Sequence, residues 1–261
     1  MLSSAQIKFI RALAQKKERD ATGLFVAEGS KTIGELLNYF TCHQLIGTKE
    51  QLDQNGFRAK EIVQASAREL ERTSFQKTPQ GMLAVFEQTS SHFNPADLNS
   101  GLYLALDGVQ NPGNLGTIIR LADWFGIHHL FCSPDTADAF GPKTVQATMG
   151  ALGRVTVHYI ELPHLLEQIP ATLPVYGTFL GGTSVYTATL PADALIVMGS
   201  EGNGISEAVA THITNRLEIP AFPPDSITSE SLNVAIATAI VAALAPSNAE
   251  LFTWEWIGGI K

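Results

Sequence analysis

The chain has 261 residues, of which 45% are hydrophobic and 16% charged, as in an ordinary globular protein with room for one large domain or for a small and a medium one. No apolar run reaches the roughly eighteen residues that span a bilayer, and the first twenty residues lack the hydrophobic region of a signal peptide, so we expect a cytoplasmic protein without membrane segments. Cys42 and Cys132 have neither metal-ligand nor disulfide spacing, so we expect no metal.

The formal net charge of −8 argues, taken alone, against a polyanionic partner. The charge is unevenly distributed, however: residues 1–97 contain 12 Lys and Arg against 11 acidic residues, and the remainder contains 5 against 14. Basic runs are most often solvated helix faces. If the protein binds RNA, the phosphates are nevertheless expected at the first nineteen residues, which carry Lys8, Arg11, Lys16, Lys17 and Arg19.

Short helices and strands alternate over the first ninety residues. Apolar periodicity predicts helices over 4–17, from a cap at Ser30 through Leu37, and over 66–73, and strands over 24–29, 44–47, 61–63 and 82–86. These elements are sufficient for a small α/β domain. The polar, turn-rich stretch 90–100 then marks a boundary, which divides the chain into domains 1–97 and 98–261.

Residues 101–126 form the most informative stretch. The apolar run 102–106 meets Asp107-Gly108, and a loop of Asn, Pro and Gly leads into apolar residues at helical spacing. Arg120 lies outside that apolar stripe but close to the expected core. Because a buried guanidinium needs a partner, we expect Arg120 to meet a carboxylate, a phosphate or a reacting group, although a solvent-facing arginine is the common alternative.

Strands and helices continue to alternate after this stretch. Further strands are predicted over 128–132, 155–159, 174–179, 194–199 and 216–219, and helices over 115–126, 141–150, 162–168, 205–212 and 231–245. This spacing predicts a mostly parallel sheet covered on both faces. The dinucleotide fingerprint G-x-G-x-x-G is missing after the first strand of this domain, which weighs against a nucleotide-binding oxidoreductase.

Three ordered motifs resemble those of the SpoU/TrmH family of RNA ribose methyltransferases. They are Asn114 with Arg120 six positions on, the segment GSEG at 199–202, and the segment SLNV at 231–234. The resemblance implies a C-terminal methyltransferase domain with a deep trefoil knot, an S-adenosylmethionine pocket formed by its loops, and a homodimer. The segments FVAEG at 25–29 and SFQKTPQG at 74–81 resemble the RNA-binding domain that precedes the catalytic domain in many members; a dimerising or stabilising domain is the alternative.

Ribose methylation needs a group that takes or relays the 2′-hydroxyl proton and a rigid grip on both reactants. The resemblance implies that the catalytic residues are Arg120, Asn114, Glu201, Ser231 and Asn233. Because a guanidinium stays protonated at neutral pH, we expect Arg120 to hold an RNA phosphate and stabilise the developing alkoxide rather than to act as a base. Asn114 should fix the loop or the ribose. Glu201, expected where a helix begins, should pair with Arg120 or with a backbone amide.

Two polar residues precede the very apolar last helix. We expect Ser231 to cap that helix and Asn233 to line the site. The resemblance places the methyl donor against Gly199, Ile219 and Leu232, with Thr178 as a weaker candidate. Without the resemblance, Ile219 and Leu232 would be assigned to the core. The connection 221–230 is longer than usual in the family, which leaves the shape of the adenine side of the pocket open.

The sequence thus predicts an S-adenosylmethionine-dependent RNA 2′-O-methyltransferase. The extra N-terminal domain favours ribosomal RNA over tRNA by analogy alone. A tRNA ribose methyltransferase and a non-catalytic RNA-binding or ribosome-assembly factor are the alternatives, and base methylation is hard to separate from ribose methylation.

Overall fold

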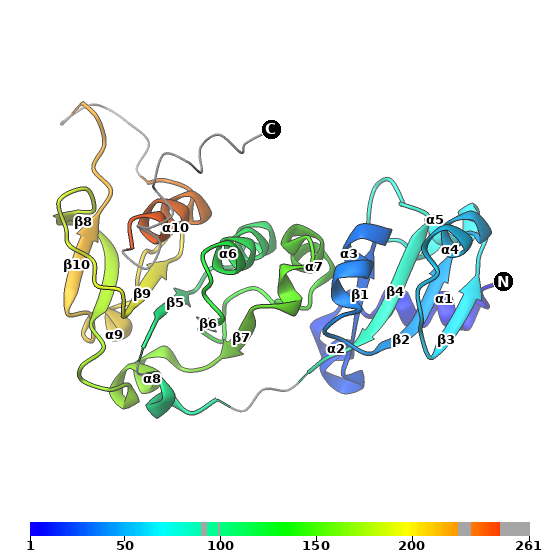
Figure 1. The fold of residues 1–261 in the computed structure, drawn as a ribbon, viewed down its shortest axis with the longest axis horizontal. Helices are drawn as coiled ribbons and strands as arrows, with labels where there is room; N and C mark the ends of the chain where they lie inside the picture. The colour runs from blue at the N-terminus through cyan, green and yellow to red at the C-terminus, as the bar shows by residue number, and fades with distance from the viewer. Residues whose placement is uncertain (90–92, 99, 224–230, 246–261) are drawn as a thin grey trace. The chain divides into compact units, whose positions relative to one another are not determined.

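The computed structural model describes residues 1–89, 93–98, 100–223 and 231–245. Contacts between residues divide the chain into two compact units (Figure 1). Unit 1 comprises Met1–Ser91, Leu115–Arg120 and Ala137–Arg154. Unit 2 comprises His92–Asn114, Leu121–Thr136 and Val155–Lys261. Each unit is built around one sheet.

The sheet of unit 1 has four strands in the order β1-β4-β2-β3. The strands β1 (Leu24–Glu28), β4 (Met82–Glu87) and β2 (Cys42–Gly47) pair antiparallel, and β3 (Glu61–Gln64) runs parallel to β2. The helices of this unit are α1 (Ser4–Ala12), α2 (Lys16–Thr22), α3 (Ser30–Leu36), α4 (Lys49–Asn55), α5 (Ala67–Thr73) and α7 (Pro142–Thr148). The four strands and the helices α3 and α5 confirm the predicted small α/β arrangement.

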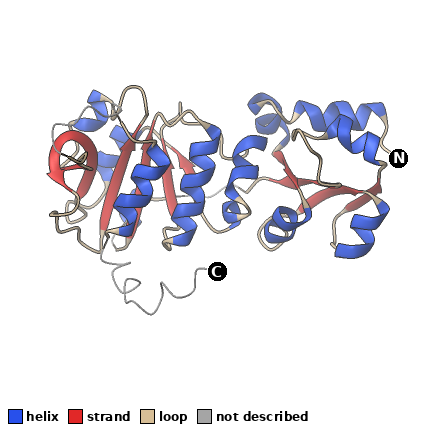
Figure 2. Cartoon of the chain, turned by 90° about the horizontal axis from the view of Figure 1, so that it is seen from above, coloured by secondary structure: helices blue, strands red, loops and turns tan. Residues whose placement is uncertain are grey.

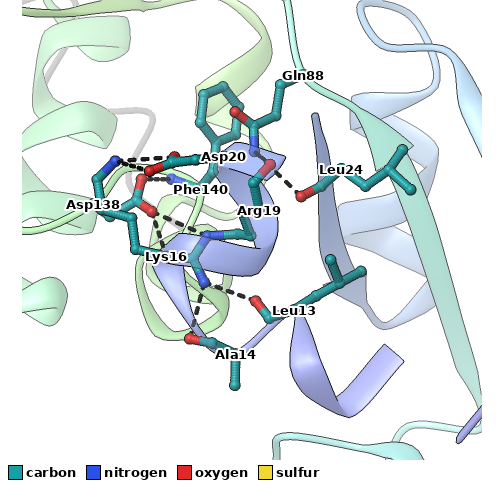
Figure 3. A network of polar contacts seen from close by, with 9 residues as sticks. All are labelled: Leu13, Ala14, Lys16, Arg19, Asp20, Leu24, Gln88, Asp138 and Phe140. Atoms are coloured by element: carbon teal, nitrogen blue, oxygen red, sulfur yellow. Dashed lines mark hydrogen bonds and ion pairs between the residues drawn. The ribbon is translucent and has the colours of Figure 1, made fainter. Parts of the chain in front are cut away.

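The single helix predicted over 4–17 is wrong, because the chain breaks after Ala12 and α2 begins at Lys16. Arg19 explains the break: its buried guanidinium donates to the carbonyls of Leu13 (2.7 Å) and Ala14 (2.9 Å) at the end of α1, and it pairs with Asp138 (Figure 3). These contacts satisfy carbonyl groups that a helix end otherwise leaves without partners.

The cap predicted at Ser30 is also wrong. Gly29 occupies the cap position of α3 with a φ of 88°, and no side-chain cap bond is present there. A Cβ on Gly29 would collide with the side chain of Gln80, so both the backbone conformation and the space require glycine.

The basic N-terminal segment is largely engaged inside its own unit. Arg19 is only 3% exposed, and Lys16 pairs with Asp20 at 2.8 Å. Arg11 donates to the carbonyl of Ser74 and lies 5.1 Å from the ring centre of Phe75. Arg19, whose donors are buried within this unit, is therefore not accessible to an RNA phosphate.

The sheet of unit 2 has six parallel strands in the order β10-β8-β9-β5-β6-β7, which confirms the predicted parallel α/β fold. The strands are β5 (Leu102–Asp107), β6 (His129–Cys132), β7 (Thr156–Tyr159), β8 (Val175–Ser184), β9 (Ala194–Gly199) and β10 (Asn215–Glu218). The long helix α6 (Pro112–Trp124) connects β5 to its neighbour β6.

Helices α8 (Leu162–Gln168) and α9 (Glu207–Ala210) cover one face of this sheet, where alternate residues of the central strands meet them. Helix α10 (Val234–Ala243) packs against β9 on the side away from α8 and α9 (Figure 1). Figure 2 shows the strands of this unit with helices beside them. Both cysteines are buried and unpaired, and none of the helices in the described part of the chain is long and apolar enough to cross a membrane.

Two histidines on the neighbouring strands β6 and β7 contact each other. His129 Nδ1 is 3.0 Å from His158 Nε2, and the His158 ring lies 4.8 Å and 5.2 Å, between centroids, from Phe93 and Phe131. Burial lowers the pKa of His158 to about 4, helped by the neighbouring His129, and burial likewise lowers the pKa of His129. The folded state therefore favours the neutral rings.

Stability is expected to fall as the pH drops from about 6.5 to about 4, because the unfolded chain binds protons there that the folded pair does not. For His158 alone the loss is on the order of 2–3 kcal/mol. Urea unfolding at pH 7.5 and pH 4.5 measures the loss of unfolding free energy. His158→Gln should remove most of this pH dependence, whereas His212→Gln should leave it unchanged. An unchanged pH dependence in His158→Gln would exclude His158 as its source.

Candidate functional site

The carboxyl ends of β5 and β9 lie side by side, since Asp107 pairs with Gly199 in the sheet. Asp107 is buried and accepts a 2.7 Å hydrogen bond from the amide of Ser206, which caps α9. The loop after β5 thus joins the segment after β9 in front of the sheet, the region where open parallel sheets bind ligands. The sequence reasoning missed this contact, although an Asp-Gly pair directly after a buried strand is a signal for it.

Helix α6 begins three residues earlier than predicted. Asn111 caps it, with its Oδ1 accepting from the amides of Gly113 (2.8 Å) and Asn114 (3.2 Å), and Pro112 is the first helical residue. As a result, Asn114 lies in the first turn of α6 rather than in the loop, and the helix backbone fixes its direction.

A tight turn follows β9. The backbones of Ser200 and Gly204 exchange two hydrogen bonds of 3.0 Å, and Glu201 lies exposed between them. A Cβ on Gly199 would collide with the backbone of Gly204 and Ile205, so this turn alone requires glycine at 199. Helix α9 begins only at Glu207, so the expectation that Glu201 lies at a helix start is wrong.

The three motif segments converge on one asparagine. Asn114 Nδ2 donates to Glu201 Oε1, and Asn233 Nδ2 donates to Asn114 Oδ1 at 3.0 Å. These contacts join the start of α6, the turn after β9 and the start of α10. Sequence reasoning selected all three residues but expected Arg120 or a backbone amide as the partner of Glu201; its partner is Asn114. We call these three residues the asparagine bridge.

Asn233, rather than Ser231, caps α10. Its Oδ1 accepts from the amides of Ala235 (3.0 Å) and Ile236 (3.3 Å), so the helix begins at Val234 and the expected cap at Ser231 is wrong. Asn233 thus has two roles at once, since its Oδ1 orders the helix start while its Nδ2 binds Asn114. Ser231 lies exposed two residues earlier.

Arg120 is exposed rather than close to the core. It forms no ion pair with a carboxylate of the described residues. It follows Asn114 by six residues in α6, a rise of about 9 Å along the helix. The burial of Arg120 was overestimated from the sequence because both of its neighbours, Ile119 and Leu121, are apolar.

The residues expected to hold the donor come from different elements: Gly199 ends β9, Thr178 lies within β8, Ile219 directly follows β10 and Leu232 precedes α10. Thr178 is partly buried, with its Oγ1 3.9 Å from the sulfur of Met198. Ile219 is partly buried just after β10, and Leu232 is 46% exposed. Leu232 is therefore not a core residue, and its exposed apolar surface is what an apolar contact with a ligand requires. The unusual connection 221–230 lies mostly outside the described residues, which resume at Ser231.

No cluster of three or more His, Cys, Asp and Glu side chains in the described ranges could hold a metal ion. The groups that meet in unit 2 are amides, one carboxylate and exposed apolar side chains. Such groups can orient two reactants and stabilise charge without a metal.

Comparison with known proteins identifies both halves of the chain. Residues 101–243 match the SpoU rRNA Methylase family, and residues 4–84 match the MRM3-like substrate binding domain. The 23S rRNA (guanosine(2553)-2′-O)-methyltransferase RlmP of Bacillus subtilis is 29% identical over 243 residues, which cover 90% of this chain and 94% of the relative.

Solved structures agree with this match. A TrmH-family RNA methyltransferase structure from Porphyromonas gingivalis has 44% identity and a TM-score of 0.82, with 94% of this chain and 98% of the other covered. The AdoMet-bound rRNA methyltransferase of Sinorhizobium meliloti has 29% identity and a TM-score of 0.83, with 97% of each chain covered. The family match covers more than half of the sequence and includes all three segments of the asparagine bridge: the chain belongs to the SpoU rRNA methylase family.

Proposed function

We propose that this protein transfers a methyl group from S-adenosylmethionine to a ribose 2′-hydroxyl of ribosomal RNA. The observation that carries the proposal is the asparagine bridge, which draws the three motif segments together beside the carboxyl ends of β5 and β9. The relatives named as 23S rRNA 2′-O-methyltransferases support ribosomal RNA as the substrate class.

When bound, S-adenosylmethionine supplies an electrophilic methyl group. The residues proposed to hold it are Gly199, Ile219, Leu232 and Thr178, of which Leu232 offers exposed apolar surface. Arg120 binds an RNA phosphate and stabilises the negative charge that develops on the 2′-oxygen as its proton passes to water. An exposed guanidinium with five donors suits both contacts.

The asparagine bridge orients the acceptor. Asn114 uses one amide hydrogen for Glu201 and one lone pair for Asn233, so one donor and one acceptor remain for the ribose. Glu201 acts on the side chain of Asn114, which it holds in one orientation. Asn233 orders the start of α10, and Ser231, two residues earlier, remains a proposed catalytic residue.

The division into a substrate-binding domain 1–97 and a methyltransferase domain 98–261, the knot in the second domain, a homodimer and a cytoplasmic location complete the proposal. The exposed apolar side chains of Ile236 and Leu244 on and just after α10 support a second copy as partner. Analytical ultracentrifugation of the wild-type protein tests the dimer, and a monomer at micromolar concentration would refute it.

The test of function is transfer of a labelled methyl group from S-adenosylmethionine to unmodified 23S ribosomal RNA and to tRNA, followed by digestion to nucleosides. The expected product is a labelled 2′-O-methyl nucleoside from the ribosomal RNA. Label in a base would refute ribose chemistry, and label in tRNA alone would refute the substrate class. Failure to bind the donor in calorimetry would favour a non-catalytic RNA-binding factor.

Replacement of Asn114 by alanine is expected to lower kcat about 10- to 100-fold, because it removes both hydrogen bonds of the bridge and the contact offered to the ribose. Single-turnover methyl transfer measures the effect.

The hydrogen bond between Glu201 and Asn114 is tested by comparing Glu201→Gln with Glu201→Ala. The side-chain oxygen of the glutamine can still accept from Asn114, so Glu201→Gln should lose less activity than Glu201→Ala. Equal losses in the two Glu201 variants would show that the charge, not the hydrogen bond, is needed.

A further inference from the structure

A hollow of about 570 Å³ opens on unit 1. It is lined by residues 37–42, which connect α3 to β2, and by residues 58–60 before β3. We call it the Tyr39 hollow. It is shallow and open to solvent. Neither the asparagine bridge nor the proposed donor residues belong to it.

Tyr39 packs against neighbouring residues and yet remains partly accessible. A Cβ on Gly153 would collide with the Tyr39 ring, so the backbone at 153 packs directly against it. The guanidinium of Arg154 lies 5.9 Å from the ring centre and is held by Glu35 at 2.8 Å. The ring nevertheless remains 46% exposed and lines the hollow. An aromatic ring fixed in this way forms a stacking platform that loses little entropy on binding.

The charges around the ring favour an anion. Arg58 and Lys60 line the hollow, and no acidic side chain is among its lining residues. Both cations are exposed, although Lys60 also pairs with Glu87 at the rim. Aromatic faces that stack bases beside cations that bind phosphates are the usual means of binding single-stranded nucleic acid.

We infer that the Tyr39 hollow binds an unpaired nucleotide of the RNA substrate, with its base stacked on Tyr39 and its phosphate on Arg58. This inference rests on the proposed function, since it assigns the RNA contact of unit 1 to particular residues. Stacking recognises any base, so the hollow contributes affinity and selects unpaired RNA rather than a sequence.

The test compares the binding of an unmodified 23S ribosomal RNA transcript to the wild type and to Tyr39→Ala, Tyr39→Phe and Arg58→Ala, with the salt concentration varied. Tyr39→Ala should raise Kd about tenfold, and Tyr39→Phe should stay within about twofold because the ring is retained. Arg58→Ala should reduce the slope of log K against log salt by about 0.7, the value for one lost phosphate contact on a single strand. Tyr186→Ala, which removes an exposed tyrosine from unit 2, should bind as the wild type does.

Melting temperatures and calorimetric donor binding verify that each variant is folded. Wild-type affinity in Tyr39→Ala, in a protein that still transfers methyl groups to RNA, overturns the stacking site and leaves the proposed function intact. Equal weakening in Tyr39→Phe and Tyr39→Ala also overturns it, because the hydroxyl and not the ring would then carry the contact. A wild type that binds the RNA but never methylates it refutes the proposed function instead.

Discussion

Replacement of Arg120 by alanine is expected to lower kcat for methyl transfer by about 10²–10³-fold, the usual loss when one group that stabilises a developing oxyanion is removed. The exposed guanidinium has no carboxylate partner in the described part of the chain. It is therefore available to substrate, and its removal should leave the fold unchanged. Single-turnover transfer to ribosomal RNA, with the donor saturating, measures the effect.

Arg120→Lys is the matched variant, because it keeps the charge and loses the planar fork. It should retain more activity than Arg120→Ala and less than the wild type. Equal activity in the alanine variant and the wild type would remove Arg120 from the mechanism. A loss confined to RNA affinity, with kcat restored at saturating RNA, would assign it to phosphate binding alone.

Replacement of Arg19 by leucine is expected to destabilise the protein by about 3–5 kcal/mol, the typical cost of breaking a buried ion pair. The substitution leaves Asp138 and the carbonyls of Leu13 and Ala14 without their donor (Figure 3). Thermal and urea unfolding measure the loss, which at about 2–4 °C per kcal/mol for a chain of this size corresponds to roughly 10 °C.

Lys16→Leu is the control for Arg19→Leu, because the Lys16–Asp20 pair is exposed and should contribute less than about 1 kcal/mol. Similar losses in the two variants would mean that the buried network adds nothing beyond an ordinary surface pair. Leucine at position 19 keeps most of the aliphatic volume, so the comparison isolates the hydrogen bonds and the charge.

The parallel sheet could be predicted from sequence because its strands are short buried runs separated by helical spacing. The runs 102–106 and 194–199 lie within one residue of β5 and β9. Helix ends were predicted less well wherever a long-range partner decides them. Arg19, whose partner Asp138 is 119 residues away, ends α1 early, and no local pattern carries that information.

The members of the candidate site could be selected from the motifs, but their contacts could not. Asn114, Glu201 and Asn233 were each expected near the reaction, yet the spacing does not reveal that Asn114 joins the other two. Ser231 and Asn233 are both good caps, and only the structure distinguishes them. From the sequence, Gly199 was interpreted only as a donor-binding residue. The structure shows that the backbone of Gly204 approaches so closely that position 199 needs glycine for the fold as well.

The pairing of β5 with β9 has a consequence for how the protein is made. Residues 102–107 find their central neighbour only at 194–199, and Asn114 meets Asn233 only 119 positions later. Pairing across such distances is entropically costly and slow. During synthesis, unit 1, whose last segment ends at Arg154, has emerged before β9 and α10, so it can fold while the asparagine bridge does not yet exist.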